Sequence, residues 1–449
     1  MEDTIVAIST SLGVGAISII RLSGSEAIKI VNKIFTKNLS QEKSHTVHYG
    51  YIKDNKEKID EVLVTIMKEP KTFTREDVVE INCHGGIATT NKILELILKN
   101  GARLAEPGEF TKRAFLNGRI DLLEAEATMD LISSKSEEAR KISINTLTGE
   151  SSRLISILRD ELIQIIGNIE VNIDYPEYED IEQLTNMKIL PFIEEFKRKL
   201  QEIIDKSEDS KMIKEGITIG IIGRPNVGKS SLLNALIEDE KAIVTNVPGT
   251  TRDIVEGSII IDGVVFNIID TAGIRQSNDI VERMGIEKSL KIIDSADLVI
   301  VILNNNEELS EEELDLLEKV RDKKHLTIIN KIDLSSKIDR SKLKDTYIEI
   351  SVNKNIGLDK IKAAIKKLFN LGELKTSDLT YLSNARSIAL LHKALKSIDE
   401  ALTEIRNNSP IDIVEFNLKE AWNYLGEIIG EVYTDELLDE LFARFCLGK

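Results

Sequence analysis

The feature that most constrains the fold is a run from Gly223 to Ser230 that fits G-x-x-x-x-G-K-[ST]. It follows the apolar run Ile217–Ile222 and precedes a stretch, 231–236, that favours a helix. Glycines let the backbone curl so that its N–H groups face a phosphate, Lys229 brings a positive charge, and the hydroxyl of Ser230 is a ligand that Mg²⁺ prefers. A plain glycine-rich turn is the alternative, but a strand and a helix stand where a phosphate-binding loop needs them. The run therefore predicts such a loop in a mostly parallel α/β sheet.

Two further motifs are expected to face the terminal phosphate. A loop contains Thr250 and Thr251, and one of these threonines is expected to complete the Mg²⁺ shell when the loop orders. The next motif follows the apolar run 265–269 and comprises Asp270, Thr271, Ala272 and Gly273. Asp270 is placed to hold Mg²⁺ through water, and the N–H of Gly273 is placed to sense the γ-phosphate.

A last motif addresses the base. Asn330, Lys331 and Asp333 follow the apolar run 326–329. The carboxylate of Asp333 can accept hydrogen bonds from N1–H and from the 2-amino group of guanine, a pair that adenine lacks, so the motif favours GTP over ATP. Ser351, which ends a further strand, is expected to contact the base. Each short motif alone is weak, but together and in this order they predict a GTP site.

Composition restricts the other possibilities. The chain has 449 residues, and 59 Lys and Arg against 76 Asp and Glu give a net charge of −17. At roughly 150 residues per domain the length suggests two to four domains. The acidic balance and the 4% aromatic content disfavour a nucleic-acid coat or a base-stacking platform. Two cysteines, Cys83 and Cys446, make no disulfide framework, and neither a signal peptide nor a membrane span is predicted, so we expect a cytoplasmic protein.

The pattern along the chain predicts a multidomain fold of α/β and α parts. Residues 1–118 predict an α+β domain, with strands near 4–7, 16–21, 46–52, 62–67 and 78–83 and helices near 26–35 and 88–98. Helical blocks at 119–212 and 373–449 flank a phosphate-loop α/β domain at 213–372. We expect the two blocks to pack together as one discontinuous helical domain, with the α/β domain inserted between them. Four consecutive units without insertion are the alternative.

The motif set resembles that of translation-factor-related GTPases, and other runs narrow the resemblance. Residues 107–118 (PGEFTKRAFLNG), 80–86 (EINCHGG) and 445–449 (FCLGK) resemble the tRNA modification GTPase family (MnmE/TrmE), over essentially the whole chain. Ser351-Val352 departs from the family's usual Ser-Ala. The resemblance implies a Ras-like GTPase that supports addition of a carboxymethylaminomethyl-type group at C5 of the wobble uridine of certain tRNAs. It also implies a flavin-dependent partner protein in a heterotetramer, a homodimer through the N-terminal and GTPase domains, and no membrane.

The resemblance also implies which residues contact the nucleotide. These GTP-binding positions are Asn226, Val227, Gly228, Lys229, Ser230, Ser231, Thr245, Asn246, Val247, Pro248, Gly249, Thr250, Thr251, Asp270, Thr271, Ala272, Gly273, Asn330, Lys331, Asp333 and Ser351. Within this set, Lys229 is expected to act in catalysis, and Ser230 and Thr251 are expected to bind Mg²⁺.

Hydrolysis needs a group that orients the attacking water. Small signalling GTPases use a glutamine for this, and the corresponding position here is Ile274, whose side chain cannot do it. From the sequence alone, the candidates for this role downstream of Ile274 are Gln276, Asp279 and Glu282. Judged by its residue type alone, Glu282 is better explained as a solvated charge on a helix surface. The resemblance assigns the role to Glu282, acting through a bridging water.

The transition state also needs positive charge near the bridge between the β- and γ-phosphates. An arginine finger is one solution, and Arg224, Arg252 and Arg275 are its candidates. The resemblance implies another solution, a K⁺ ion. Its expected ligands are Asn226, Thr245, Val247 and Thr250.

The N-terminal domain is informative mainly through the resemblance. Arg21 ends one apolar strand and Glu80 lies in another, and the residues alone favour an ordinary ion pair or solvent-facing charges. The resemblance implies a site for a 5-formyltetrahydrofolate-type folate. Its expected residues are Arg21, Glu80, Arg119 and Lys449.

Cys446 has two interpretations. The resemblance implies a part in the modification chemistry, and the alternative is a small apolar residue packed near Phe442 and Phe445.

Two rival functions stay open. A ribosome-assembly GTPase would often carry a basic RNA-binding module, which does not stand out here. A one-carbon transferase with a regulatory GTPase domain would transfer methyl or formyl groups without a partner protein.

Overall fold

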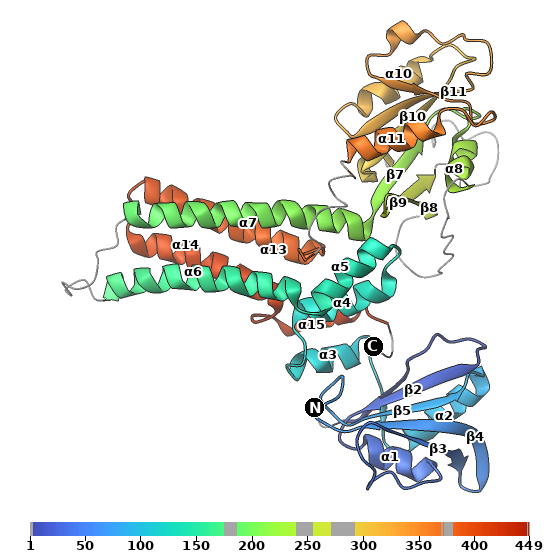
Figure 1. The fold of residues 1–449 in the computed structure, drawn as a ribbon, viewed down its shortest axis with the longest axis vertical. Helices are drawn as coiled ribbons and strands as arrows, with labels where there is room; N and C mark the ends of the chain where they lie inside the picture. The colour runs from blue at the N-terminus through green and yellow to red at the C-terminus, as the bar shows by residue number, and fades with distance from the viewer. Residues whose placement is uncertain are drawn as a thin grey trace. The chain divides into compact units, whose positions relative to one another are not determined.

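A computed structural model describes residues 3–174, 186–238, 255–270, 292–369, 371, 380–446 and 448. The chain divides into two compact units (Figure 1). The first unit comprises Met1–Ile132, Leu147–Ile189 and Lys396–Lys449. The second unit comprises Ser133–Thr146 and Leu190–Leu395.

The N-terminal part of the first unit is a six-stranded sheet in the order β3-β4-β5-β2-β1-β6. Its strands are β1 (Ile5–Ile8), β2 (Ile17–Ser23), β3 (Thr46–Asp54), β4 (Glu57–Met67), β5 (Val78–His84) and β6 (Arg103–Leu104). All neighbours are antiparallel except β1 and β6. The strands predicted from the sequence are confirmed, but β4 starts earlier than expected because it forms a hairpin with β3 through the left-handed residue Asn55.

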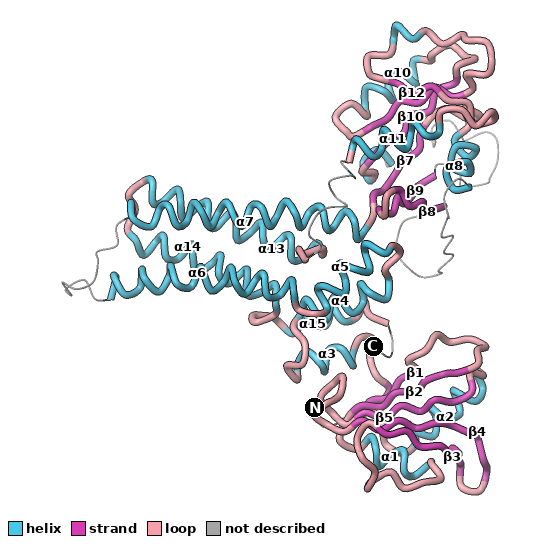
Figure 2. Tube along the Cα trace, viewed as in Figure 1, coloured by secondary structure: helices cyan, strands magenta, loops and turns pink. Residues whose placement is uncertain are grey.

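Two helices, α1 (Ala27–Ile34) and α2 (Ile87–Lys99), pack on one face of this sheet (Figures 1 and 2). Alternation along the strands sends Ile20, Ile81 and Cys83 into the core under these helices. The residues that alternate with these core residues, including Arg21 and Glu80, lie on the opposite face of the sheet. Near β1, that opposite face packs against Phe110 of α3 (Glu109–Leu116).

The remaining helices of the first unit come from both ends of the chain. They include α4 (Leu122–Ser133), α6 (Glu150–Asp174), α14 (Ile411–Ile429) and α15 (Asp435–Phe442). Helices α6 and α14 pack against each other, so the helices before and after the α/β part of the chain pack together, as predicted. Phe115 and Leu122 share a small core with Leu438, Phe442 and Phe445.

The second unit contains the other six-stranded sheet, in the order β12-β11-β10-β7-β9-β8. Its strands are β7 (Ile217–Ile222), β8 (Val255–Ile261), β9 (Val264–Asp270), β10 (Leu298–Asn304), β11 (His325–Asn330) and β12 (Tyr347–Glu349). All neighbours are parallel except β8 and β9. Every residue of β10 is buried, as expected for a central strand with both faces covered.

Helices on the two faces of this sheet make two cores. The helices are α8 (Lys229–Glu238), α10 (Glu311–Lys319) and α11 (Leu358–Leu368), with a short 3₁₀ turn at Arg340–Lys342. The alternation of strand and helix predicted from the sequence is confirmed, and it places the carboxyl ends of β7, β10 and β11 at one edge.

The long helix α7 (Asn186–Glu215) leads directly into β7. Gly216 makes the turn with φ of 83°, and a Cβ there would lie 2.5 Å from the carbonyl oxygen of Val265. Two more helices of the described part of the chain are α5 (Glu137–Leu147) and α13 (Ala385–Arg406). Among the described helices, none combines the length and apolar composition that crossing a membrane requires.

Candidate functional site

The predicted phosphate loop connects the end of β7 to the start of α8. Gly223 has φ of 146°, and a Cβ there would lie 2.4 Å from the carbonyl oxygen of Ile302 on β10. Gly228 has φ of 105°, and its Cβ would lie 2.4 Å from the side-chain amide nitrogen of Asn330. Both positions therefore require glycine, because a side chain would meet backbone or a fixed amide. The loop is held tightly against the edge where the parallel strands end.

Lys229 and Ser230 occupy the first turn of α8. Lys229 Nζ donates to the carbonyl oxygens of Gly223, at 2.7 Å, and of Arg224, at 2.9 Å, so its ammonium group lies across the loop. Ser230 is exposed. A helix N-terminus with an adjacent ammonium group favours a phosphate, and an exposed hydroxyl is a suitable oxygen ligand for Mg²⁺. The residues present thus fit a magnesium–nucleotide.

Asn330 joins the base motif to the phosphate loop. Its side chain is buried, its Nδ2 donates to the carbonyl oxygen of Val227 at 2.9 Å, and its Oδ1 accepts from the N–H of Lys331 at 2.8 Å and of Val352 at 3.3 Å. Lys331 Nζ donates to the carbonyl oxygen of Asn226 at 2.7 Å. These contacts fix the loop with the predicted base-recognition residues relative to the predicted phosphate loop.

Ser351 positions the carboxylate of Asp333. Its hydroxyl is fully buried, donates to Asp333 Oδ1 at 2.6 Å, and accepts from the N–H of Lys354 at 3.3 Å. This hydrogen bond is the main cause that holds the pKa of Asp333 below its ordinary value, so the carboxylate stays an acceptor. The contact between Ser351 and the base stays a prediction, and the structure adds that the Ser351 side chain orients Asp333.

Several predicted site residues fall outside the described residues. They are Thr245, Asn246, Val247, Pro248, Gly249, Thr250, Thr251, Thr271, Ala272, Gly273, Glu282 and Lys449, and the weighed alternatives Arg252, Ile274, Arg275, Gln276 and Asp279. Asp270 is the last residue of β9. Strand β9 is parallel to β7 and Asp270 is opposite Ile221, so Asp270 lies at the same sheet edge as the phosphate loop.

The structure brings Arg21 and Glu80 together on neighbouring strands. Arg21 donates from Nε and Nη2 to Oε1 of Glu80, at 2.8 Å for both contacts, and the side chains are 20% and 22% exposed. Arg21 Nη1 also lies 3.4 Å from the carbonyl oxygen of Gly448, which brings the chain end to this pair. Arg119 is exposed and stacks on the ring of Phe73 at 4.9 Å. The ion pair that the residues alone favoured is thus present.

The two cysteines have opposite environments. Cys83 lies in the N-terminal core, where burial is the main cause that raises the pKa of its thiol. Cys446 is exposed, and its carbonyl oxygen accepts from the N–H of Gly108 at 3.4 Å. Phe442 and Phe445 pack in the small core, but the exposed side chain of Cys446 does not support the interpretation of a buried apolar residue.

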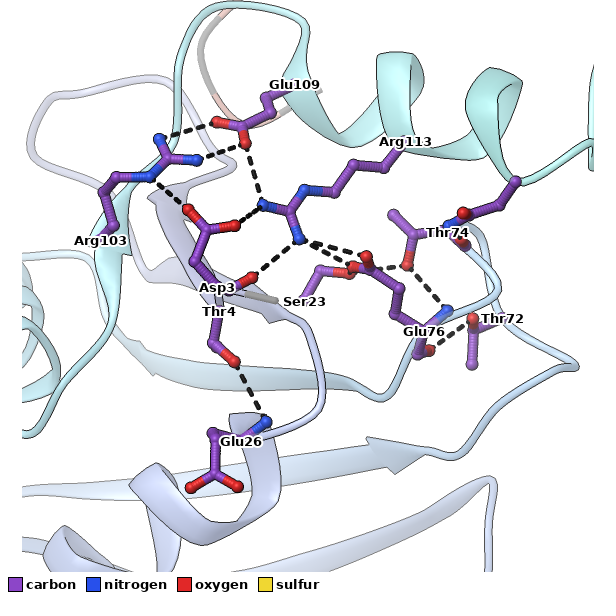
Figure 3. Close-up of polar contacts among 11 residues, drawn as sticks. Asp3, Thr4, Ser23, Glu26, Thr72, Thr74, Glu76, Arg103, Glu109 and Arg113 are labelled. Carbon is purple, nitrogen blue, oxygen red and sulfur yellow. Dashed lines mark hydrogen bonds and ion pairs between the residues drawn. The ribbon is translucent and has the colours of Figure 1, made fainter. Parts of the chain in front are cut away.

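Sequence reasoning missed a buried network around Arg113 (Figure 3). The Arg113 side chain is 1% exposed, and its Nη2 donates to Asp3 at 2.8 Å and to Glu109 at 3.0 Å. Its Nη1 contacts both carboxylate oxygens of Glu76, at 3.1 and 3.2 Å, and Arg103 contacts Glu109 at 2.6 Å. The sequence pointed to this network only through the run 107–118, which contains Glu109 and Arg113. In the structure Arg113 contacts Glu109 and connects that run to Asp3 at the start of the chain and to Glu76.

Comparison with known proteins agrees with these observations. A family model described as the MnmE helical domain matches residues 122–446, and one described as the GTP-binding protein TrmE N-terminus matches residues 4–119. The tRNA modification GTPase MnmE of Bacillus velezensis is 49% identical over 458 residues and covers 100% of both chains. The protein of the same name from Listeria welshimeri is 51% identical over 454 residues, which is 100% of this chain and 99% of that one.

A solved structure with local sequence similarity is the G domain of the FeoB iron transporter of T. maritima. It is 31% identical over 34% of this chain and 98% of its own, with a TM-score of 0.26, a value too low to establish a common fold. The family models and the curated relatives, in contrast, extend over nearly the whole chain. They agree with the predicted combination of an N-terminal α+β part, a helical part and a phosphate-loop α/β part. The chain therefore belongs to the family of the tRNA modification GTPase MnmE.

Proposed function

We propose that this chain hydrolyses GTP and that hydrolysis supports the modification of tRNA. The proposal rests on one arrangement: the phosphate loop and the Asp333–Ser351 pair are joined through Asn330 at one edge of the sheet. In this proposal the phosphate loop holds the triphosphate, and the Asp333–Ser351 pair selects guanine. The full-length identity of 49% with a tRNA modification GTPase supports the assignment of purpose.

The residues at the phosphate loop divide the work. Lys229 carries a positive charge to the β- and γ-phosphates, and Ser230 with Thr251 and Asp270 would hold Mg²⁺, which supplies charge neutralisation when bound. Glu282 orients the attacking water through a second water. Asn226, Thr245, Val247 and Thr250 would hold K⁺, which takes the place of an arginine finger.

The same family resemblance suggests the wider role. We propose cytoplasmic addition of a carboxymethylaminomethyl-type group at C5 of the wobble uridine, with a flavin-dependent partner that supplies redox chemistry. The chain acts as a homodimer through its N-terminal and GTPase domains. Its proposed domains are 1–118, 119–212 with 373–449, and the inserted 213–372, and Cys446 takes part in the modification chemistry.

The N-terminal domain is proposed to bind a reduced folate of the 5-formyltetrahydrofolate type. The partly exposed Arg21–Glu80 pair supports this proposal, because Glu80 can accept from the N–H groups of a pterin while Arg21 or Arg119 meets a carboxylate. Lys449 at the chain end is the remaining proposed contact. Glu80→Ala is expected to abolish folate binding in equilibrium dialysis, and unaltered affinity would contradict the site.

Nucleoside analysis tests the central proposal. tRNA from cells lacking this protein is digested and examined by mass spectrometry, before and after complementation with the intact gene. The expected result is loss and restoration of a C5-substituted wobble uridine. Unchanged nucleosides in the deletion strain would contradict the proposal, and sedimentation of the protein with ribosomal subunits would favour a ribosome-assembly role.

Turnover measurements test the two catalytic assignments. Glu282→Gln is expected to retain GTP binding and to lose at least about 100-fold in kcat, because water orientation is needed only in the transition state. GTP turnover is expected to rise with K⁺ and not with Na⁺. Equal rates in both salts would remove K⁺ and revive the arginine candidates.

A further inference from the structure

Asp60 and His84 form a closely held pair at one end of the N-terminal sheet. His84 Nδ1 lies 2.6 Å from Asp60 Oδ1, and the backbone N–H of His84 donates to Asp60 Oδ2 at 2.8 Å. The Asp60 side chain is 9% exposed, whereas that of His84 is 70% exposed. A nearly buried carboxylate thus holds an imidazole that faces solvent.

Part of this arrangement has a structural purpose. The ladder between β4 and β5 ends at the pair Leu63 and Asn82, so the N–H of His84 lies beyond its last partner. Asp60 Oδ2 satisfies that N–H and terminates the ladder. The contact between Oδ1 and the ring is not needed for this purpose. It fixes the orientation of an exposed ring, which costs rotamer freedom and buries little apolar surface.

The ring contact also determines the tautomer. A carboxylate has no hydrogen to donate, so Nδ1 of His84 carries the hydrogen in this contact. Nε2 is then the lone-pair nitrogen of the neutral ring. Carboxylates hold the imidazoles of acid–base sites in this way, so that one nitrogen stays available for a proton.

The backbone on the far side of His84 is equally restrained. Gly85 donates to the carbonyl oxygen of Ala16 at 3.4 Å and accepts from the N–H of Gly15 at 3.0 Å. A Cβ on Gly85 would lie 2.5 Å from the carbonyl oxygen of Gly15, so a larger residue cannot occupy this position. This close approach explains part of the run 80–86, and it prevents the backbone of His84 from shifting.

His84 lies on the sheet face that carries the proposed folate pair. Residues of β5 alternate, so His84 and Glu80 point away from the core that contains Cys83. Arg21 is opposite Glu80, and Ile17, which is 63% exposed, is opposite His84. Glu80 and His84 are four positions apart, which is about 13 Å along the strand.

We propose that Asp60 and His84 are a proton-transfer pair for a ligand bound on this sheet face. Nε2 of His84 takes a proton from an N–H or O–H of the ligand, and the electron pair of that bond stays on the ligand. Asp60 remains ionised and stabilises the imidazolium, which then releases the proton to water at its exposed edge. The inference rests on the proposed folate-type site, which supplies a ligand long enough to reach from Glu80 to His84.

Ring nitrogen NMR tests the proposal on the full-length protein. The chain has 5 histidines, so ¹⁵N-histidine labelling yields few signals, and His84→Gln identifies those of His84. The expected result is hydrogen on Nδ1 of His84, and a shift of its Nε2 signal when 5-formyltetrahydrofolate is added. Hydrogen on Nε2 with none on Nδ1 would overturn the proposal. So would bound folate that leaves the His84 signals unmoved, whereas absence of folate binding overturns the proposed folate site as well.

A complementation series supplies the functional readout. His84→Gln is expected to reduce the modified nucleoside by at least about 100-fold and Asp60→Asn by about 10-fold, while GTP turnover of both proteins changes less than about threefold. The matched control is His48→Gln in the same sheet, whose ring contacts the hydroxyl of Thr46 at 2.8 Å. Full modification with His84→Gln would overturn the proposal.

Discussion

Two arginines of the N-terminal domain pair with glutamates in opposite ways. Arg113 is 1% exposed and bonds Asp3, Glu76 and Glu109, so its charge is balanced inside the protein (Figure 3). Arg21 bonds Glu80, and both side chains of that pair are about one-fifth exposed. In the first arrangement, three acidic residues already surround a buried guanidinium. The second keeps carboxylate and guanidinium edges accessible to a ligand.

The difference shows that an Arg–Glu pair alone does not indicate function. Arg113 connects α3 to the start of the chain and to the loop before β5, and Lys112 on the same helix contacts Asp439 of α15 at 2.5 Å. A buried charge without partners is costly, so this network is needed to keep α3 on the sheet. Arg21 lies on a strand that the ladder already holds, so its pair is available for binding.

The largest expected effect separates the two arginines by stability. Arg113→Ala leaves Glu76 and Glu109 without their shared cation, which should cost about 3–5 kcal/mol. Arg21→Ala should cost less than about 1 kcal/mol, because its pair is partly solvated. The measurement is thiol labelling, since Cys83 is buried in this domain and Cys446 is exposed.

In that experiment Cys446 reacts first and serves as an internal control. The slow reaction of Cys83 reports opening of the N-terminal domain, and Arg113→Ala should accelerate it at least about 100-fold. Equal acceleration by Arg21→Ala would contradict the distinction between a closed and an open pair.

A second, smaller effect is acid lability of the closed network. Burial tends to raise the pKa of Glu109, but hydrogen bonds from Arg103, the Glu106 N–H and Arg113 together hold it below its ordinary value. The hydrogen bond from Arg103 likewise lowers the pKa of Asp3. The unfolded chain therefore binds more protons in acid, so the stabilisation is present above about pH 4 and is lost as pH falls through the lower folded-state values.

Glu109→Gln tests this sign. The difference in free energy of opening between wild type and variant should be largest near neutral pH and shrink below about pH 4. Hydrogen exchange of the β5 amides, corrected for intrinsic rates at each pH, measures it. A difference that grows in acid would show that the sign is wrong.

The smallest expected effect applies the same comparison to the GTP site. There a buried hydroxyl, Ser351, holds an accessible carboxylate, Asp333, so the supporting residue is buried and the proposed binding residue is exposed. Ser351→Ala should let the pKa of Asp333 rise toward its ordinary value and weaken GTP binding about 5- to 10-fold, the worth of one hydrogen bond.

Titration calorimetry with GTP and GDP measures that loss. Ser335→Ala is the matched control, because this serine donates to Asn306 at 3.0 Å on an exposed loop of the same sheet. Unchanged affinity in Ser351→Ala would remove the serine from base recognition.

Much of the fold was predictable because its signals are local. The alternation of short apolar runs and helices predicted the parallel sheet, and the phosphate loop lies where the sequence placed it, between β7 and α8. The length of β4 was not predictable, since its first residues are polar and are held in the strand by pairing with β3. The role of Ser351 was also hidden, because its partner Asp333 lies on a different loop.

The sequence by itself determined where the glycine-rich loop and the Asn330–Asp333 motif lie, after β7 and at the end of β11, because each motif consists of neighbouring residues. Only the tertiary structure decided which distant side chains meet: Arg113 with Asp3 and Glu76, Asn330 with the phosphate loop, and Asp60 with His84. These pairings depend on strand register and on the relative positions of the loops. The hydrophobic periodicity and the composition of the sequence do not specify either one. The physical reason is that burial and hydrogen-bond satisfaction are properties of packed surfaces, not of neighbouring residues in the chain.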